Sequence, residues 1–153
     1  MKDRTSHDEL SLELFIVLAR AYNSVVAHSI RDIQSYGLNS TEFGVLDLLF
    51  HKGPQPLQKI GEKVLISSGN ITYVADKLQN KNLLVRKASP EDRRVIFADL
   101  TEEGRTLFES IFPKHERVLV DAVSELDMDE KKQAVELLRK LGLSAENKFK
   151  SKA

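Results

Sequence analysis

The sequence predicts a mainly α-helical protein with one small β-hairpin and a long helix at each end of the chain. Apolar residues recur at helical spacing along most of the chain, and helix-capping residues divide that pattern into segments. Only residues 83–100 combine β-branched and aromatic residues on both sides of a turn, as a hairpin does. With 153 residues, 41% of them hydrophobic, the chain can bury one core, which a partner subunit would extend.

Composition excludes several classes of protein. The absence of cysteine excludes disulfides, thiolate zinc sites and cysteine-based redox sensing. The charged N-terminal residues lack the apolar segment of a secretion signal, and we expect no hydrophobic run long enough to cross a bilayer. We therefore expect a cytoplasmic protein without a membrane partner.

The charges are unevenly distributed although their formal sum is zero. Residues 51–95 hold 9 Lys and Arg against 4 Asp and Glu, whereas residues 1–50 hold 4 against 7 and residues 96–153 hold 10 against 12. A basic middle between two acidic flanks indicates that the centre of the chain meets an anion.

The first helix is expected from about His7 to Gln34, ending near Gly37. Ser6 and Glu9 have the spacing of a capping box at its start. Apolar side chains occur on more than one side of this helix, so it needs more than one neighbour. We expect those neighbours to be its own core and another subunit.

Two helices are expected next. Asn39 and Glu42 repeat the capping pattern, and they start a second helix that ends before Gly53. Two prolines then interrupt the chain, and a short third helix covers about residues 57–64.

A fourth helix begins at a Ser67 cap, after a tight connection at residues 65–66, and runs to about Lys81. Its expected inward residues are Ile71, Val74, Ala75 and Leu78. The third and fourth helices, followed by the hairpin, have the order of a winged helix-turn-helix, in which the second helix of the pair enters the DNA major groove.

Polar side chains on the outward face of the fourth helix can bond to base edges or phosphates, and its N-terminus can receive a phosphate. The candidate DNA-binding residues of this helix are Ser67, Ser68, Gly69, Asn70, Thr72, Tyr73 and Lys77. Each alone is equally explained as an ordinary surface residue, and Ser67 as a cap. The helix and the hairpin together favour DNA binding.

The hairpin pairs residues 83–87 with residues 95–100 around a charged turn. Arg93 and Arg94 in that turn can reach phosphates or a groove, and Asp92 can orient one guanidinium group. The expected core residues of the hairpin are Val95 and Phe97. A charged turn alone is more often a solvated loop, so the position of the hairpin after a polar-faced helix decides the interpretation.

Several stretches resemble the MarR family of bacterial transcriptional regulators. They are LNSTEFGVL at 38–46, ISSGNITYVADKLQNKNLLVRK at 66–87, SPEDRRVIFADLTEEG at 89–104, and the long helix expected after Thr101. The resemblance implies an obligate homodimer that binds pseudo-palindromic operators on double-stranded DNA, usually as a repressor. It also implies release from DNA when a small, often aromatic, ligand binds.

The resemblance assigns roles by position. Residues 67–77 match the recognition helix of the family, and Arg93 matches the wing arginine that enters the minor groove. Arg94 is expected to pair with Asp76 or Asp92 and thereby to support the wing.

The chain departs from the family pattern at two turns. Val64 and Leu65 stand where relatives often have glycine between the two helices of the motif, so this turn lacks a residue suited to a positive φ. Asn82 stands where a glycine is common, a mild change because asparagine tolerates a left-handed C-cap.

The C-terminal third is expected to form two more helices. Thr101 caps the first of them, which Pro113 should kink, and Asp127 begins the second. We therefore expect a helical dimerisation region at residues 1–36 and 101–147, a reading lobe at residues 38–100 and a flexible tail at residues 148–153. The alternative to dimerisation is a monomeric helical subdomain.

An effector pocket is expected where the first, second and fifth helices meet. Aromatic side chains with a few polar groups are typical of ligand sites. The candidate lining residues are Phe15, Tyr22, His28, Phe43, Asp47, Phe50, His51 and Phe112. Packing in the core explains each of them as well.

We expect no metal, no cofactor and no catalysis. The histidines lack the short spacing of a metal site, although a zinc site assembled in space from His28, His51 or His115 with Asp47 or Glu116 stays open. The sequence contains no nucleophile elbow, phosphate-binding glycine loop or metalloprotease motif.

The most specific interpretation is a homodimeric winged helix-turn-helix transcriptional regulator. The alternative is a winged-helix adaptor that binds proteins and no longer reads DNA. A small hydrolase is a second alternative, and no motif supports it.

Overall fold

The computed structural model describes residues 6–64 and 68–151, and the chain forms two compact units, Met1–Leu119 and Val120–Ala153. The predicted connection at residues 65–66 and the predicted cap Ser67 lie outside the described residues.

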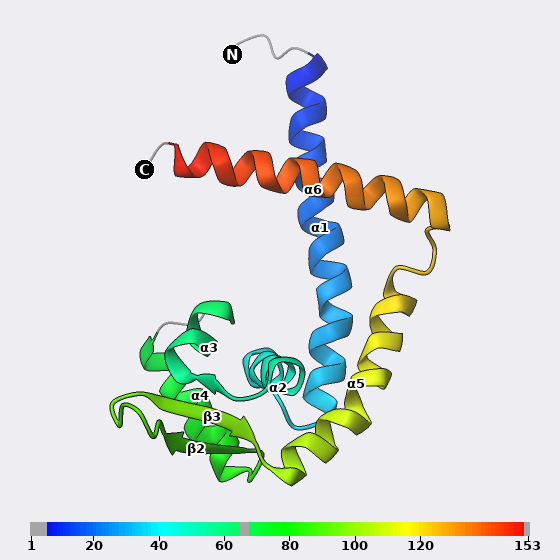
Figure 1. Cartoon of the computed structure of the whole chain (residues 1–153). Helices are drawn as coiled ribbons and strands as arrows, with labels where there is room; N and C mark the ends of the chain where they lie inside the picture. Colours follow the sequence, from blue (N-terminus) through cyan, green and yellow to red (C-terminus); the bar gives the residue numbers. More distant parts are fainter. Residues whose placement is uncertain (1–5, 65–67, 152–153) are drawn as a thin grey trace. The chain divides into compact units, whose positions relative to one another are not determined.

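The long first helix is present as predicted. α1 (Ser6–Ser35) has α2, α3, α4 and the strands gathered at its C-terminal end, whereas its N-terminal half extends away from them (Figure 1). Ile33, near the C-terminal end, is 4% exposed, and Phe15, in the N-terminal half, is 71% exposed. Within the first unit, the C-terminal end of this apolar helix is therefore covered and its N-terminal half is not.

α1 is also long and apolar enough to cross a bilayer when judged by length and composition alone. An 18-residue stretch of it has a mean hydropathy of 1.5, so the expectation that no such run exists was wrong. A helix with apolar residues on several sides, as needed to pack against several neighbours, reaches the same hydropathy as a membrane span. This measure does not distinguish the two.

In the reading lobe, α2 has the predicted cap and α4 has the predicted inward face. α2 (Ser40–Lys52) begins at Asn39, whose Oδ1 accepts a hydrogen bond from the Glu42 N–H at 2.8 Å, while Glu42 Oε2 accepts one from the Asn39 N–H at 3.0 Å. α3 (Leu57–Lys63) is short, and α4 (Ser68–Asn80) follows it. The predicted inward residues of α4 are all buried: Ile71, Val74, Ala75 and Leu78.

The predicted hairpin forms an antiparallel sheet with one extra strand. β2 (Leu84–Ala88) and β3 (Ile96–Leu100) pair with each other, and β1 (Gln55–Pro56) pairs with the other side of β3, giving the order β1-β3-β2. The strand β1 was not predicted, because a two-residue strand that contains proline has no alternating pattern.

The face of β3 that enters the core is not the predicted one. Ala98 and Leu100 are 0% and 7% exposed, whereas Val95 is 37% exposed and Phe97 is half-buried. Successive residues of a strand point to opposite faces, so residues 98 and 100 share the core face, and residues 95 and 97 share the other one. The choice of Val95 and Phe97 as core residues was wrong by one position in register.

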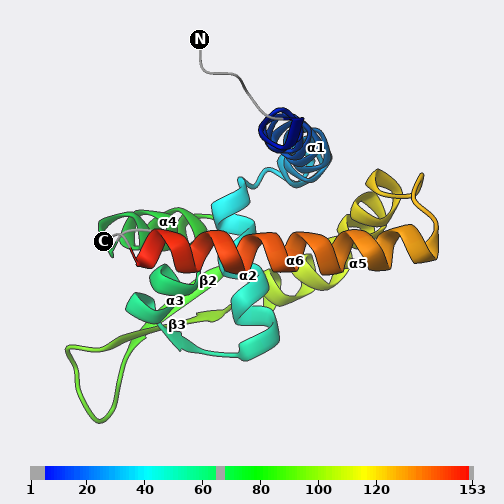
Figure 2. The ribbon, with the colours of Figure 1, turned by 90° about the horizontal axis from the view of Figure 1, so that it is seen from above.

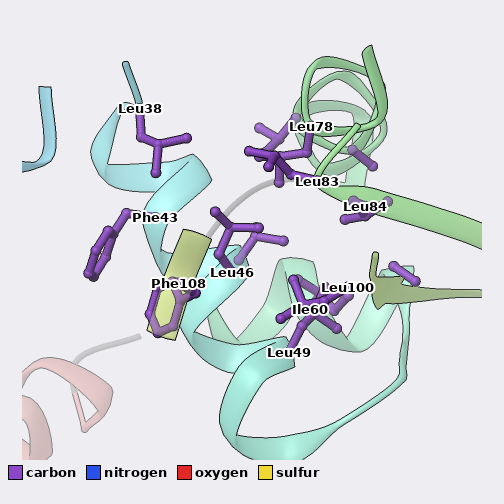
Figure 3. Close-up of a cluster of buried hydrophobic side chains, with 14 of the residues drawn as sticks. Leu38, Phe43, Leu46, Leu49, Ile60, Leu78, Leu83, Leu84, Leu100 and Phe108 are labelled. Carbon is purple, nitrogen blue, oxygen red and sulfur yellow. The ribbon is translucent and has the colours of Figure 1, made fainter. Parts of the chain in front are cut away.

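A single apolar core joins α2, α3, α4, the strands and α5 (Glu102–Ala122) (Figure 3). Its fully buried large side chains are Val45, Leu46, Leu49, Ile60, Ile71, Leu78, Leu84 and Phe108. At the start of α5, Thr101 Oγ1 accepts a hydrogen bond from the Gly104 N–H at 2.9 Å, as expected of a cap. α5 continues through Pro113, and Figure 1 shows it changing direction near its middle.

The second unit contains α6 (Met128–Lys150). Asp127 caps it in a complete capping box with Glu130, in agreement with the predicted start. The helix continues beyond residue 147 to Lys150, so residues 148–150, which were assigned to the tail, are helical. Most of its apolar side chains are exposed, as on the N-terminal half of α1.

Candidate DNA-binding site

The predicted DNA-contacting face of α4 is exposed. Asn70, Thr72, Tyr73 and Lys77 are all accessible on the side opposite the buried residues. Ser68 and Gly69 form the first turn of this helix, and Ser67 lies outside the described residues. The described part of α4 therefore offers hydroxyl, amide and ammonium groups on one surface, which suits base edges and phosphates.

Tyr73 and Lys77 interact with each other on this face. Lys77 Nζ lies 5.2 Å from the centroid of the Tyr73 ring, one helical turn away. A side-chain hydrogen bond with Tyr73 raises the pKa of Lys77. The contact holds the ammonium group beside the Tyr73 ring on the exposed face of the helix.

The two arginines of the wing, the β2–β3 hairpin, have different surroundings. Arg94 donates to Asp92 through its backbone N–H at 3.0 Å, through Nε at 3.1 Å and through Nη2 at 3.2 Å. The Arg94 side-chain hydrogen bond lowers the pKa of Asp92, so this carboxylate stays charged. Of the two partners expected for Arg94, the structure shows Asp92. Arg93 is exposed, and the β2–β3 loop that carries it projects beyond the helices of the first unit (Figure 2).

Asp76 supports the wing through a different residue from the one expected. Its Oδ1 lies 2.6 Å from Nη2 of Arg86 on β2, and Gln79 Oε1 accepts from Arg86 Nε at 2.9 Å. Two residues of α4 therefore hold one guanidinium group of the wing strand. A role for Arg86 was not predicted, because no local sequence pattern links it to Asp76.

Half of the predicted effector residues form an aromatic cluster around Phe108. The ring centroid of this completely buried residue lies 5.2 Å from that of Phe43, 5.1 Å from that of Phe50 and 5.4 Å from that of Phe112. His51 stacks edge-on against Phe112 at 5.1 Å, and its Nδ1 lies 3.1 Å from Asp47 Oδ1. Phe108 was not among the predicted residues, although helical periodicity places it inward.

Asp47 thus lies beside the cluster, whereas the three predicted effector residues of α1, Phe15, Tyr22 and His28, are exposed. Phe15 and Tyr22 are 71% and 65% exposed. Since a helix rises about 1.5 Å per residue, Phe15 lies roughly 30 Å from the C-terminal end of α1, where the aromatic cluster packs. Within one chain, Phe15 is therefore too far from Phe112 to share a pocket with it.

A buried polar cluster joins α1 to α5. His115 is 5% exposed, and its Nδ1 lies 2.7 Å from Asp32 Oδ2, while its Nε2 lies 3.3 Å from Ser29 Oγ. Tyr36 donates to Asp32 Oδ1 at 2.9 Å, and burial, together with this carboxylate, raises the pKa of Tyr36.

The candidate zinc ligands do not converge. His51 pairs with Asp47, and His115 pairs with Asp32 in a separate cluster. Over residues 6–64 and 68–151, no group of three or more His, Asp or Glu side chains could hold a metal ion.

The short α3, the polar-faced α4 and the arginine-bearing hairpin define a winged helix-turn-helix protein. The MarR family pattern matches residues 38–96. The chain is also 54% identical over 137 residues to the HTH-type transcriptional regulator MhqR of Bacillus subtilis (strain 168), with 90% of this chain and 94% of that one covered. The chain belongs to the MarR family of transcriptional regulators, so it is a regulator and not an enzyme.

Two solved structures have the same fold. The YusO protein of Bacillus subtilis is 27% identical with a TM-score of 0.70, covering 91% of this chain and 99% of that one. Bordetella bronchiseptica BpsR, whose DNA binding is regulated by 6-hydroxynicotinic acid, is 29% identical with a TM-score of 0.72, covering 85% and 98%.

Proposed function

We propose that this protein is a cytoplasmic, homodimeric repressor that binds an imperfectly palindromic operator. The recognition helix α4 enters the major groove, and Arg93 enters the adjacent minor groove. The observation that carries the proposal is the difference between the two wing arginines: Arg94 pairs with Asp92 at 3.1 Å, whereas Arg93 is exposed on the same hairpin loop. The pair of Arg94 and Asp92 stabilises the loop, and the exposed Arg93 is then available to enter a groove.

The two long helices support the dimer. Exposed apolar side chains on α1 include Leu14 at 52% and Ile16 at 47%, and α6 exposes Leu137 at 66%. Apolar surface of this extent marks an interaction site, and a two-fold DNA reader needs a second copy. Two reading lobes then meet successive major grooves about 34 Å apart.

A small aromatic acid is the proposed effector. BpsR, which shares the fold over nearly its whole length, responds to 6-hydroxynicotinic acid. In this chain Phe50 and Phe112 are half-buried beside His51, so the rim of the aromatic cluster offers rings and a polar group. The ligand must bind the arrangement of the two lobes that cannot bind DNA better than the one that can. A ligand with equal affinity for both would not change the equilibrium between them.

Selection of bound sequences from random duplex DNA tests the operator directly. We expect an imperfect palindrome whose half-sites lie one helical turn apart. Affinity for the selected duplex should fall roughly 10³- to 10⁵-fold between about 50 and 200 mM salt if 6–10 phosphates are contacted. No enrichment, together with no salt-dependent duplex binding, would instead support the protein-binding adaptor.

Arg93→Ala tests the wing. We expect weaker binding to all duplex sequences and a salt dependence reduced by about one phosphate contact. Arg117→Ala, which removes an exposed arginine of α5, is the matched control and should bind as the wild type does. Equal binding by Arg93→Ala and the control would contradict the assignment of Arg93.

Leu14→Glu tests the dimer. A charge in an apolar interface is expected to cost about 2 kcal/mol or more per subunit, so sedimentation at micromolar concentration should show single chains of 17.3 kDa. Thr106→Glu, which adds the same charge at an exposed position of α5, should remain dimeric. A wild-type protein that sediments as a monomer would rule out the dimer.

The effector is tested by thermal shift and by release from the operator. We expect one or more of 6-hydroxynicotinic acid, salicylate-like acids, phenols and quinones to raise the Tm and to weaken operator binding. Phe112→Ala should reduce both effects. No shift and no release with any compound would contradict the aromatic effector.

A further inference from the structure

A left-handed turn closes the C-terminal end of the recognition helix α4. Asn82 has a φ of 58°. Its N–H donates to the Gln79 carbonyl at 2.9 Å, and the N–H of Leu83 donates to the Leu78 carbonyl at 2.9 Å. These bonds form a Schellman motif, which ends a helix in a defined geometry. The backbone of Lys81, just before the left-handed residue, is therefore held in place.

Lys81 bonds to two groups outside α4. Its Nζ donates to the Gly37 carbonyl at 2.8 Å, to Glu42 Oε1 at 3.0 Å and to Glu42 Oε2 at 2.9 Å. Gly37 lies in the corner between α1 and α2, and Glu42 lies in the first turn of α2. One ammonium group thus joins the end of the recognition helix to both elements.

Glu42 needs this cation because its carboxylate is buried. The residue is 3% exposed, and a buried charge is costly unless it is paired and hydrogen-bonded. The Asn39 N–H donates to Oε2 at 3.0 Å, but this donor is uncharged. Lys81 supplies the opposite charge. Removing one partner leaves the other unpaired, whereas removing both charges together costs less.

Lys81 directly follows the last residue of α4, so it lies beyond the part of the helix that would meet DNA. It follows the buried Leu78 by three residues and the exposed Lys77 by four, so it lies at the edge between the buried and the exposed face. The exposed Thr72 and Tyr73 lie two or more turns nearer the start of the helix. An ammonium group already shared between three acceptors at the far end of the helix is not available to a phosphate.

We propose that Lys81 is a positioning residue for DNA reading, whose bonds to Glu42 and Gly37 set the orientation of the recognition helix relative to α2 and the α1–α2 corner. The inference rests on the proposed entry of α4 into the major groove. Through Gly37, the same bonds connect the recognition helix to the end of α1. A shift of α1 therefore changes the presentation of the reading face.

Lys81→Met is the first test, measured on the selected operator duplex over a range of salt concentrations. We expect affinity to fall roughly 3- to 30-fold, the range for residues that act without touching the ligand. The slope of log K against log salt should stay that of the wild type. A slope reduced by about 0.9 would show a phosphate contact instead and would overturn the proposal. Lys114→Met, an exposed lysine on α5, is the matched control and should bind normally.

A double-mutant cycle with Glu42→Gln is the second test. We expect Glu42→Gln/Lys81→Met to bind the operator more tightly than the sum of the two single effects implies, because no unpaired charge remains. Additive effects would contradict a shared positioning role.

Amide hydrogen exchange of the free protein separates this inference from the proposed function. Lys81→Met should speed exchange in residues 70–80 and 37–43 and leave α6 unchanged. If Lys81→Met exchanges faster but the wild-type protein binds no duplex DNA, the proposed DNA binding is refuted and the structural role of the Lys81 bonds is still supported. Unchanged exchange would overturn the positioning role even if the wild type binds its operator.

Discussion

The reading lobe and the two long terminal helices cover their apolar side chains to very different extents. In the lobe, Leu46, Leu49 and Ile60 are completely buried. On α1, Leu14 is 52% exposed, and on α6, Leu137 is 66% exposed. Leucine occurs in both regions at helical spacing, so the difference lies in what surrounds each helix rather than in its composition.

This contrast separates two kinds of information in an amphipathic pattern. Periodic apolar residues predict which face of a helix must be covered, but they do not identify what covers it. In the lobe, α2, α3 and the strand β2 cover the inward face of α4 within the same chain. For the N-terminal half of α1 the proposed cover is a second copy, so the two regions should respond differently to the same substitution.

Of the paired substitutions, Phe108→Ala and Phe15→Ala should differ most in their effect on the free energy of unfolding. Phe108 is 0% exposed at the centre of the aromatic cluster, so its removal should lower the free energy of unfolding by about 3–5 kcal/mol. Phe15 is 71% exposed, so Phe15→Ala should act only through the association of two copies. Thermal unfolding at several protein concentrations distinguishes the two mechanisms, because only a change in association makes the shift in Tm depend on concentration.

The comparison would fail if both variants lost the same stability at every protein concentration. That result would mean that Phe15 packs within its own chain. Phe149→Ala, which removes a third phenylalanine that is 78% exposed, provides a control on α6.

Local signals made most of the lobe predictable. Asn39 and Glu42 stand three residues apart, and this spacing alone predicted the start of α2. The same holds for Asp127 at the start of α6 and for the inward face of α4. In each case the determining interactions lie within one helical turn or one helical period.

Contacts between distant residues were not predictable. Lys81 and Glu42 are separated by 39 residues, and His115 and Asp32 by 83 residues, so no local pattern links either pair. The core face of β3 was missed for a related reason, since its register depends on pairing with β1 and β2. Within the candidate site, the residue types were predictable, whereas the pairing of Asp76 with Arg86 was not.

Gly104→Ala and Gly142→Ala compare the same change in the two regions. A Cβ on Gly104 would lie 2.1 Å from the Leu83 carbonyl oxygen, a backbone atom that cannot move aside easily, so we expect a loss of about 1–3 kcal/mol or more. A Cβ on Gly142 meets nothing within 4 Å, and alanine favours a helix over glycine by up to about 1 kcal/mol. Chemical denaturation should therefore shift in opposite directions for the two variants.

A loss of stability in Gly142→Ala, accompanied by weaker association, would sharpen the comparison. It would place Gly142 at a close contact between two copies. Unchanged stability in Gly104→Ala would contradict the close approach of α5 to the turn at Leu83.

Asn82→Gly and Asn23→Gly should differ least in their effect on stability, and the two changes should again have opposite signs. Asn82 has a φ of 58°, which glycine adopts without the steric cost that a side chain carries, so Asn82→Gly should raise stability by a few tenths of a kcal/mol. Asn23 is an exposed residue in the interior of α1, where glycine is a poorer helix former than asparagine, so the same substitution should lower stability by about 0.3 kcal/mol. Matched thermal unfolding curves can resolve the sign. A decrease for both variants would mean that the turn at residue 82 depends on the asparagine side chain, and the left-handed backbone alone would then not explain why asparagine serves where glycine is common.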